Sequence, residues 1–346
     1  MSSTNLFMDT LALKPTPRRP IWVMRQAGRY LPEYREIRAR YSFREMVQTV
    51  DLATEVTLQP VRRFGLDAAI IFSDILVLLE ALGVPYQITE NKGPVLDRAI
   101  RTEDDYASLS EAPVSDSLGY VYSALGILRQ ELPTDVALLG FAGAPWTLAS
   151  YLIEGGGSST GFPAIRALLE TNPALFGKIM DRITAGVIDH LKNQLACGAD
   201  AVQVFDSWAG MPTRDVFRQA ARPYLQRIAD ALDGEYVIFY PKGAGHWLTK
   251  EEVHQFGILG VDWTHSLSYY REQFGPDVVL QGNLDPAILM TDAKTIRQET
   301  WAVLDSHGPA PGHIFNLGHG ITPDVPTDHM MALVDAVHEH SMETLQ

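Results

Sequence analysis

Short apolar runs alternate with helical patterns along this chain, and the alternation predicts its fold. Each run is followed by polar or glycine-rich residues and then by a stretch with helical periodicity. The runs comprise residues 21–24, 68–72, 136–141, 201–205, 236–240, 259–263, 278–280 and 313–317. Eight strand–helix units predict an α/β protein of the (β/α)8 TIM-barrel type.

The spacing of the units also predicts how the chain is organised. Helices are expected over residues 32–40, 45–64, 145–153, 173–197, 213–232, 249–256 and 324–340. We expect residues 1–15 to form a flexible N-terminal arm and residues 16–346 to form a single barrel domain. Residues 83–135 form an insertion between the second and third predicted strands, in which residues 84–94 have the pattern of a hairpin. An open, doubly wound sheet is the alternative, but its usual glycine-rich fingerprint does not follow the first strand.

Residues 136–153 contain no charged side chain and resemble a membrane span in length. Gly140, Gly143 and Pro145 interrupt them, so we predict a strand, a turn and the start of a helix instead. The first twenty residues have no apolar stretch long enough for a signal peptide. We therefore expect a soluble cytoplasmic protein without a membrane partner.

Charge narrows the functional classes. The chain has a formal net charge of −14, which argues against a general nucleic-acid partner because phosphates would be repelled. Residues 18–44 nevertheless hold eight arginines, no lysine and two acids. Guanidinium groups bind carboxylate or phosphate bidentately and stay charged, so this segment predicts a site for a multiply anionic small molecule.

The candidate chemistry follows the predicted strands, because sites in a barrel gather at the carboxyl ends of its strands. Arg25 and Arg29 follow the first run, and their apolar flanks favour ligand binding over pairing with surface acids. Asp74 follows the second run, where a helix N-cap and a group pointing into the barrel mouth remain equal alternatives. If Ser73 supplies the cap, Asp74 is free for the mouth.

Three other positions have functional and structural interpretations. Tyr151 lies in an apolar helix, where tyrosine is more often part of the core. His319 stands between two glycines, which allow close backbone approach, and histidine ordinarily titrates near neutral pH. Residues 155–161 (GGGSSTG) are expected to be flexible, either as a lid or as a plain surface loop.

No motif for an organic cofactor or a metal is present. The P-loop, dinucleotide, HExxH and nucleophile-elbow patterns are all missing. The single cysteine, Cys197, excludes an intramolecular disulfide and a multi-cysteine zinc site. We therefore predict neither cofactor nor metal.

Six stretches together resemble the uroporphyrinogen decarboxylase family, in order, from about residue 20 to the C-terminus. They are PIWVMRQAGRYLPEYR (20–35), IFSDIL (71–76), GFAGAPWTL (140–148), FDSWAG (205–210), QGNLDP (281–286) and NLGHG (316–320). The arginine-rich first stretch is the most specific of the six, whereas a piece such as GNLDP is weak alone.

The resemblance implies a (β/α)8 barrel, a homodimer and a cofactor-independent carboxy-lyase. The implied reaction removes four acetate carboxyl groups from uroporphyrinogen III, giving coproporphyrinogen III and CO2 on the route to haem. The implied catalytic residues are Asp74, Arg25 and Arg29. The implied substrate-binding residues are Arg25, Gln26, Ala27, Gly28, Arg29, Arg38, Asp74, Tyr151, Phe205, Ser207 and His319.

Two alternatives remain beside this expectation. Zinc-dependent corrinoid or thiol methyltransferases have the same type of barrel, but they bind zinc through cysteine thiolates and histidine, which Cys197 alone does not allow. A non-catalytic tetrapyrrole binder would use arginine forks equally well. The identity of the general acid does not follow from the sequence.

Overall fold

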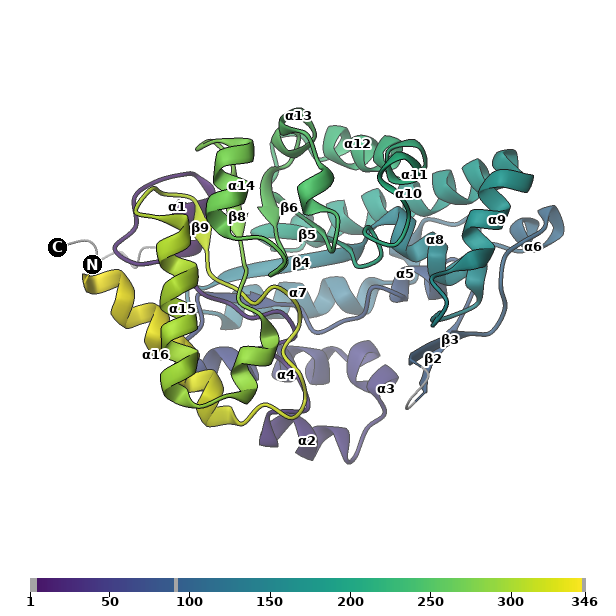
Figure 1. Cartoon of the computed structure of the whole chain (residues 1–346). Coiled ribbons are helices and arrows are strands. Elements are labelled where there is room, and N and C mark those ends of the chain that lie inside the picture. The colour runs from purple at the N-terminus through teal and green to yellow at the C-terminus, as the bar shows by residue number, and fades with distance from the viewer. Residues whose placement is uncertain (1–4, 90–92, 344–346) are drawn as a thin grey trace.

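The computed structural model describes residues 5–89 and 93–343, and its centre is a curled sheet of seven parallel strands (Figure 1). Neighbouring strands pair in the order β1-β4-β5-β6-β7-β8-β9. The strands are β1 (Ala68–Ile70), β4 (Ala137–Gly143), β5 (Ala201–Asp206), β6 (Val237–Pro241), β7 (Gly257–Gly260), β8 (Val279–Gln281) and β9 (His313–Ile314). The mixed α/β class and the parallel sheet agree with the prediction.

Helices surround this sheet (Figure 1). The longer helices are α4 (Val50–Phe64), α7 (Gly119–Glu131), α8 (Pro145–Glu154), α10 (Pro173–Ala196), α12 (Arg222–Ala231), α15 (Ala293–His307) and α16 (Thr327–Glu343). The shorter ones are α1 (Leu6–Leu11), α2 (Pro32–Arg38), α3 (Phe43–Gln48), α5 (Val77–Ala81), α6 (Glu103–Ala107), α9 (Pro163–Thr171), α11 (Arg214–Ala220), α13 (Lys250–His254) and α14 (Leu267–Phe274). Three 3-10 turns are η1 (Val114–Asp116), η2 (Gly245–Trp247) and η3 (Pro286–Met290).

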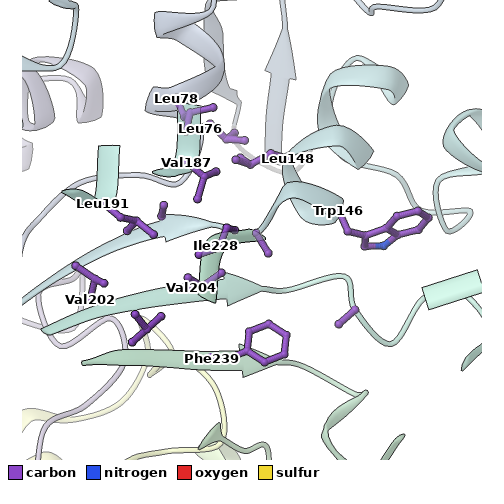
Figure 2. Packing of buried hydrophobic residues seen from close by; sticks show 14 of the residues in the cluster. Leu76, Leu78, Trp146, Leu148, Val187, Leu191, Val202, Val204, Ile228 and Phe239 are labelled. Carbon is purple, nitrogen blue, oxygen red and sulfur yellow. The ribbon is translucent and has the colours of Figure 1, made fainter. Parts of the chain in front are cut away.

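Alternation along the strands builds two apolar layers. In β5, Val202 and Val204 belong to the cluster between sheet and helices, whereas Ala201 and Phe205 belong to the inner cluster. Figure 2 shows the outer layer, in which the two valines and Phe239 from the sheet lie near Val187, Leu191 and Ile228 from the helices. The burial of both faces explains why the strands read as continuous apolar runs in the sequence.

Two of the predicted long helices are each divided in the structure. The helix expected over 45–64 breaks at Thr49, whose extended backbone separates α3 from α4. A capping box of Ser42 and Glu45 fixes the start of α3 at Phe43, two residues before the expected one. The helix expected over 213–232 breaks at Ala221, because Pro223 has no backbone N–H and its ring excludes a continuous helix.

The strand expected over 259–263 is shifted. β7 comprises Gly257–Gly260, and the chain then leaves the sheet. The Asp262 carboxylate accepts hydrogen bonds from the backbone N–H groups of Gly243 and Thr264. Such side-chain bonds compete with ladder pairing and end the strand.

The first predicted strand, residues 21–24, is only an isolated parallel bridge between Ile21 and Phe315. Its backbone nevertheless contacts both edges of the sheet. Phe315 donates its N–H to the Pro20 carbonyl, and Asp67, just before β1, donates its N–H to the Ile21 carbonyl. The Asp67 carboxylate then accepts the Ile21 N–H at 2.8 Å. A side chain thus takes the place of a strand partner at this edge.

Part of the predicted N-terminal arm is ordered by apolar contacts. Within residues 5–15, α1 begins after Asn5, whose side chain accepts the Met8 N–H. Phe7 and Leu11 are buried in the same inner cluster as Ile238 and Ile258 of the sheet. This differs from the loose arm we expected, because its two apolar side chains close the inside of the sheet. The division into an arm and one barrel domain stays a prediction.

The segment between β1 and β4 has structure of its own. β2 (Tyr86–Thr89) and β3 (Gly93–Leu96) pair antiparallel, as the predicted hairpin requires; Asn91, within that hairpin, lies outside the described residues. Residues 155–157, which we expected to be flexible, pair with β3: Leu96 donates to the Gly155 carbonyl, and Gly157 donates to the Pro94 carbonyl. Backbone pairing therefore holds at least this part of the glycine stretch in place.

The uncharged stretch at 136–153 divides as expected, into β4 and most of α8. No helix among the described residues is both long and apolar enough to cross a membrane.

Candidate active site

One large cavity of about 1230 Å³ opens beside the carboxyl ends of β1, β4 and β5. Its walls come from the arginine-rich segment, the end of β1, the hairpin and the loop after β9. The residues that line the cavity include Arg25, Gln26, Ala27, Gly28, Arg29, Arg35, Arg38, Ser73, Asp74, Ile88, Phe141, Phe205, Ser207 and His319. Ten of the eleven predicted site residues are in this set; Tyr151 is not.

A clamp of buried amides holds the turn that presents the arginines. The Gln26 side chain accepts the Val23 N–H at 3.0 Å and donates to the Ala68 carbonyl at 3.1 Å. On the other side, the Asn316 side chain accepts the Met24 N–H at 2.9 Å. Gln26 is buried, so losing these bonds would leave polar groups unpaired. Its side chain is therefore structural, whatever its backbone contacts.

Arg25 occupies the left-handed region of the backbone, with φ of 64°. That conformation is uncommon for a residue other than glycine, and it turns the chain so that the side chain faces the cavity. Gly320 makes room for it: a Cβ there would lie 2.7 Å from Arg25 Cγ and 2.9 Å from its Nε. The glycine after His319 thus has a steric reason that the sequence alone did not reveal.

Seven of the eight arginines divide into structural and available groups; the eighth, Arg40, does not line the cavity. Arg18 pairs with Asp67 through two 2.6 Å contacts, and Arg44 pairs with Glu80. Arg19, Arg35 and Arg38 donate to backbone carbonyl groups. The side chains of Arg25 and Arg29, both exposed to the cavity, make no hydrogen bond or ion pair with any described residue. These two guanidinium groups are free to bind an anion.

Asp74 is the only acid among the residues lining the cavity, within the described part of the chain. Its Oδ1 accepts the Leu76 N–H at 2.8 Å in the turn before α5, whose N-cap is Leu76, so Asp74 is not the helix cap and faces the cavity. Ser73 does not cap: its Oγ is buried without a hydrogen-bond partner among the described residues. Burial raises the pKa of Asp74, opposed by the Leu76 bond and by Arg25.

His319 lines the cavity as a neutral imidazole. Burial first, and then Lys242 and Arg25, lower its pKa to about 3. Its ring stacks parallel to Tyr240, whose hydroxyl donates to the Gly318 carbonyl at 2.6 Å. The expectation that this histidine titrates near neutral pH is therefore wrong, because the ring is buried and two nearby cations disfavour its protonated form.

The remaining predicted residues are Phe205 on β5, Ser207 directly after it, and Tyr151 on α8. Phe205 and Ser207 line the cavity. The Phe205 ring lies edge-on to the Phe141 ring, with the ring centroids 5.6 Å apart. Tyr151 instead packs edge-on against Phe162 and Trp208. Burial raises the pKa of Tyr151, and Asp74 and Arg25 also act on it, so its hydroxyl is in the same electrostatic environment.

Phe141, Arg35 and Ile88 line the cavity but were not predicted as site residues. A signal existed for Phe141, which is in register with the inward positions of β4, two residues after Leu139 of the inner cluster. No such signal existed for Ile88, because the position of a hairpin relative to a barrel is not encoded in local periodicity.

A buried acid, Asp206, stabilises the turn next to the cavity. Asp206, fully buried, accepts a 2.6 Å hydrogen bond from the Thr147 hydroxyl, which itself accepts the Trp208 N–H. Its Oδ2 has no partner among the described residues. Burial therefore raises the pKa of Asp206 to about 7, with the Thr147 bond opposing. The pair fixes the turn that contains Ser207.

Comparison with known proteins identifies the family that this chain matches. The family model described as "Uroporphyrinogen decarboxylase (URO-D)" matches residues 2–340. The chain is 45% identical over 341 residues to a uroporphyrinogen decarboxylase of Alkalilimnicola ehrlichii, covering 96% of this chain and 93% of the relative. It is 42% identical over 356 residues to one of Magnetococcus marinus, covering 100% and 99%.

Among solved structures, a methyltransferase from Methanosarcina mazei is similar with a TM-score of 0.82. The match covers 96% of this chain and 97% of that one at 21% identity, so it concerns the fold alone.

The proton on Asp206 makes a testable prediction for stability. The folded protein holds it up to about pH 7, whereas the unfolded chain releases it near pH 3.8. Raising the pH between these values therefore lowers the free energy of unfolding, by at most about 1.4 kcal/mol per pH unit. Asp206→Asn keeps the acceptor for Thr147 and does not titrate, so its stability relative to the parent should rise from pH 4 to pH 7.

Urea unfolding at several pH values measures this difference, with Asp135→Asn, an exposed aspartate, as the matched control. A difference between Asp206→Asn and the parent that is the same at both ends of the range would contradict the prediction.

Proposed function

The chain belongs to the uroporphyrinogen decarboxylase family, and from that premise we propose how its residues remove four acetate carboxyl groups from uroporphyrinogen III to give coproporphyrinogen III and CO2. The enzyme class is carboxy-lyase. The observation that supports the assignment of roles is the cavity itself, which four arginines and one carboxylate line among the described residues.

The arginines bind the rim of the substrate. Uroporphyrinogen has eight carboxylates around its macrocycle, and guanidinium forks match carboxylates in charge and geometry. Arg25 and Arg29 have no partner among the described residues, so substrate does not compete with an existing ion pair. Arg38 donates one bond to the Tyr41 carbonyl and keeps its remaining N–H groups for a carboxylate. Backbone groups of Gln26, Ala27 and Gly28 complete this side of the cavity.

Asp74 binds the centre of the macrocycle. The four pyrrole N–H groups point inward and need an acceptor, and Oδ1 is already bonded to Leu76, which leaves Oδ2 for them. Decarboxylation leaves an electron pair that a pyrrole ring protonated at carbon can delocalise. The cationic ring serves as the electron sink, so we propose that no organic cofactor or metal takes part. An ionised Asp74 stabilises that cation by preorganised electrostatics.

The other residues orient the side arms. Ser207 and His319 line the cavity, and Phe205 provides an apolar surface beside them. Because His319 is neutral, it acts as a hydrogen-bond partner rather than as a cation. For Tyr151 we propose the same role once substrate is bound; the shared electrostatic environment with Asp74 and Arg25 supports it. Arg25 or Arg29 anchors the reacting acetate or delivers a proton through water.

We also propose the finer architecture. Residues 21–24 complete a closed (β/α)8 barrel as its eighth strand, supported by the backbone bonds of Pro20 and Ile21 to the two sheet edges. Residues 83–135 are its insertion and residues 16–346 its single domain. A homodimer and a cytoplasmic location follow from the family resemblance and remain proposals.

The alternatives are less well supported. A zinc methyltransferase would need a cluster of metal ligands, and no group of three His, Cys, Asp or Glu side chains in residues 5–89 and 93–343 is arranged to hold a metal. Cys197 caps the end of α10 and does not line the cavity. A non-catalytic tetrapyrrole binder would use the same arginines, and only turnover separates it from an enzyme.

Anaerobic incubation with uroporphyrinogen III, followed by chromatography of the oxidised porphyrins, tests the function. We expect the eight-carboxylate peak to be replaced by the four-carboxylate product. Binding without loss of carboxyl groups would indicate the carrier instead.

Asp74→Asn should lower turnover in this assay by about 100- to 1000-fold, because it removes the charge that stabilises the cationic ring. The fold should persist, since asparagine still accepts the Leu76 N–H. Asp292→Asn is the matched control: the Asp292 carboxylate also accepts a backbone N–H, that of Thr295, but Asp292 does not line the cavity. Full activity in Asp74→Asn would rule out a charge-stabilising role.

Arg29→Ala should raise the KM for uroporphyrinogen about tenfold or more and leave the melting temperature nearly unchanged, because the Arg29 side chain makes no hydrogen bond or ion pair with the described residues and its carbonyl bond to Arg35 is kept in the variant. Arg40→Ala removes an equally exposed arginine of the same segment that does not line the cavity. Equal KM values for the two variants would count against a binding role for Arg29.

A further inference from the structure

We propose that Ile88, on the β2–β3 hairpin, contacts the face of a pyrrole ring of the bound tetrapyrrole and determines how tightly the ligand is held. This inference rests on the function proposed above and adds a residue that lies outside all six family-like stretches. Ile88 lines the cavity, yet 48% of its surface is exposed. An exposed apolar side chain at the wall of a ligand cavity can bury its surface against the apolar part of a ligand.

The register of the hairpin directs Ile88 toward the cavity. Tyr86 and Ile88 are two residues apart on β2 and therefore project from the same face. Tyr86 is buried, and Asp74 contributes to raising its pKa, so the start of β2 lies near the cavity carboxylate. The strand then runs outward from Asp74, which places Ile88 beyond it along the wall.

The hairpin is held in this position by its second strand. β3 pairs with residues 155–157 through the Leu96 N–H and the Pro94 carbonyl. Gly156 has φ of 147°, and a Cβ there would lie 2.7 Å from the Pro94 oxygen, so only glycine permits this approach.

The connection leads directly to the site helix. Arg101, shortly after β3, donates to the carbonyls of Ile153 and Glu154 at the end of α8. Tyr151 lies on the same helix. The hairpin and the helix beside the site are thus joined by backbone and guanidinium bonds, and Ile88 has a defined position relative to the cavity. Figure 1 shows the hairpin projecting from the body of the protein near α8.

The chemistry of the substrate requires such a surface. Its carboxylates lie on the rim, whereas the faces of its pyrrole rings are apolar. Arginines bind the rim and Asp74 the centre, which leaves a ring face to be covered. Each decarboxylation converts an acetate into a methyl group, so anionic contacts become fewer while the apolar area grows. A contact such as Ile88 keeps its strength throughout, because area burial does not depend on charge.

The hairpin contains its own control residue. Val95, on β3, is exposed to 42% and is apolar, but it pairs with Gln87 and does not line the cavity. Ile88→Ala and Val95→Ala therefore remove similar exposed apolar groups from the same two strands. Any general effect on the hairpin appears in both variants, and only a contact with ligand separates them.

The test uses two measurements. Quenching of tryptophan fluorescence measures the anaerobic binding of coproporphyrinogen III, and a separate assay measures the turnover of uroporphyrinogen. Ile88→Ala should raise the Kd and KM about three- to tenfold and leave kcat within about twofold, because the lost contact is apolar and is made in ground and transition states alike. Ile88→Val, which keeps most of the side chain, should stay near the parent values. Val95→Ala should leave Kd and KM within about twofold.

Equal Kd values for Ile88→Ala and Val95→Ala would overturn the proposal, as would a fall in kcat with unchanged KM. The proposed function is tested separately by the parent protein: a parent that binds coproporphyrinogen but does not turn over uroporphyrinogen refutes catalysis, while the Kd comparison still decides the role of Ile88. A parent that binds neither compound refutes both.

Discussion

The site depends on a buried polar clamp that locks residues 20–24 between two edges of the sheet. Asp67 accepts the Ile21 N–H, Gln26 bonds to Val23 and Ala68, and Asn316 accepts the Met24 N–H. In these bonds, side chains replace the backbone partners of an ordinary strand. The chain can therefore leave the sheet immediately afterwards and turn at Arg25. Because each partner is buried, breaking the clamp would leave unpaired polar groups at a substantial cost.

Once the turn is fixed, the charges separate by function. Arg18 and Arg44 neutralise acids of the scaffold, and Arg25 and Arg29 remain available in the cavity. In a chain of net charge −14, this local cationic surface attracts an anionic ligand to one place. Burial, and then Lys242 and Arg25, lower the pKa of His319, so positive charge in the cavity comes from guanidinium, whose protonation does not change near neutral pH.

Much of the fold and most of the candidate site were accessible from the sequence because they depend on local signals. Buried parallel strands read as apolar runs, and polar residues after them point to one rim, which brought Asp74, Ser207 and His319 together. The predicted boundaries of helices and strands were wrong where a single residue interrupted the hydrophobic periodicity. Pro223 divides one helix, the extended Thr49 divides another, and the bonds of Asp262 end β7 early.

The sequence by itself determined the alternation of strands and helices, the concentration of arginine and the presence of one acid after the second apolar run. Only the tertiary structure decided which arginines are free, because pairing depends on acids distant in the chain, such as Asp67 and Glu80. It also decided that His319 is neutral and that Ile88 reaches the cavity. Burial and neighbouring charge act through space, and no local pattern of residues records them.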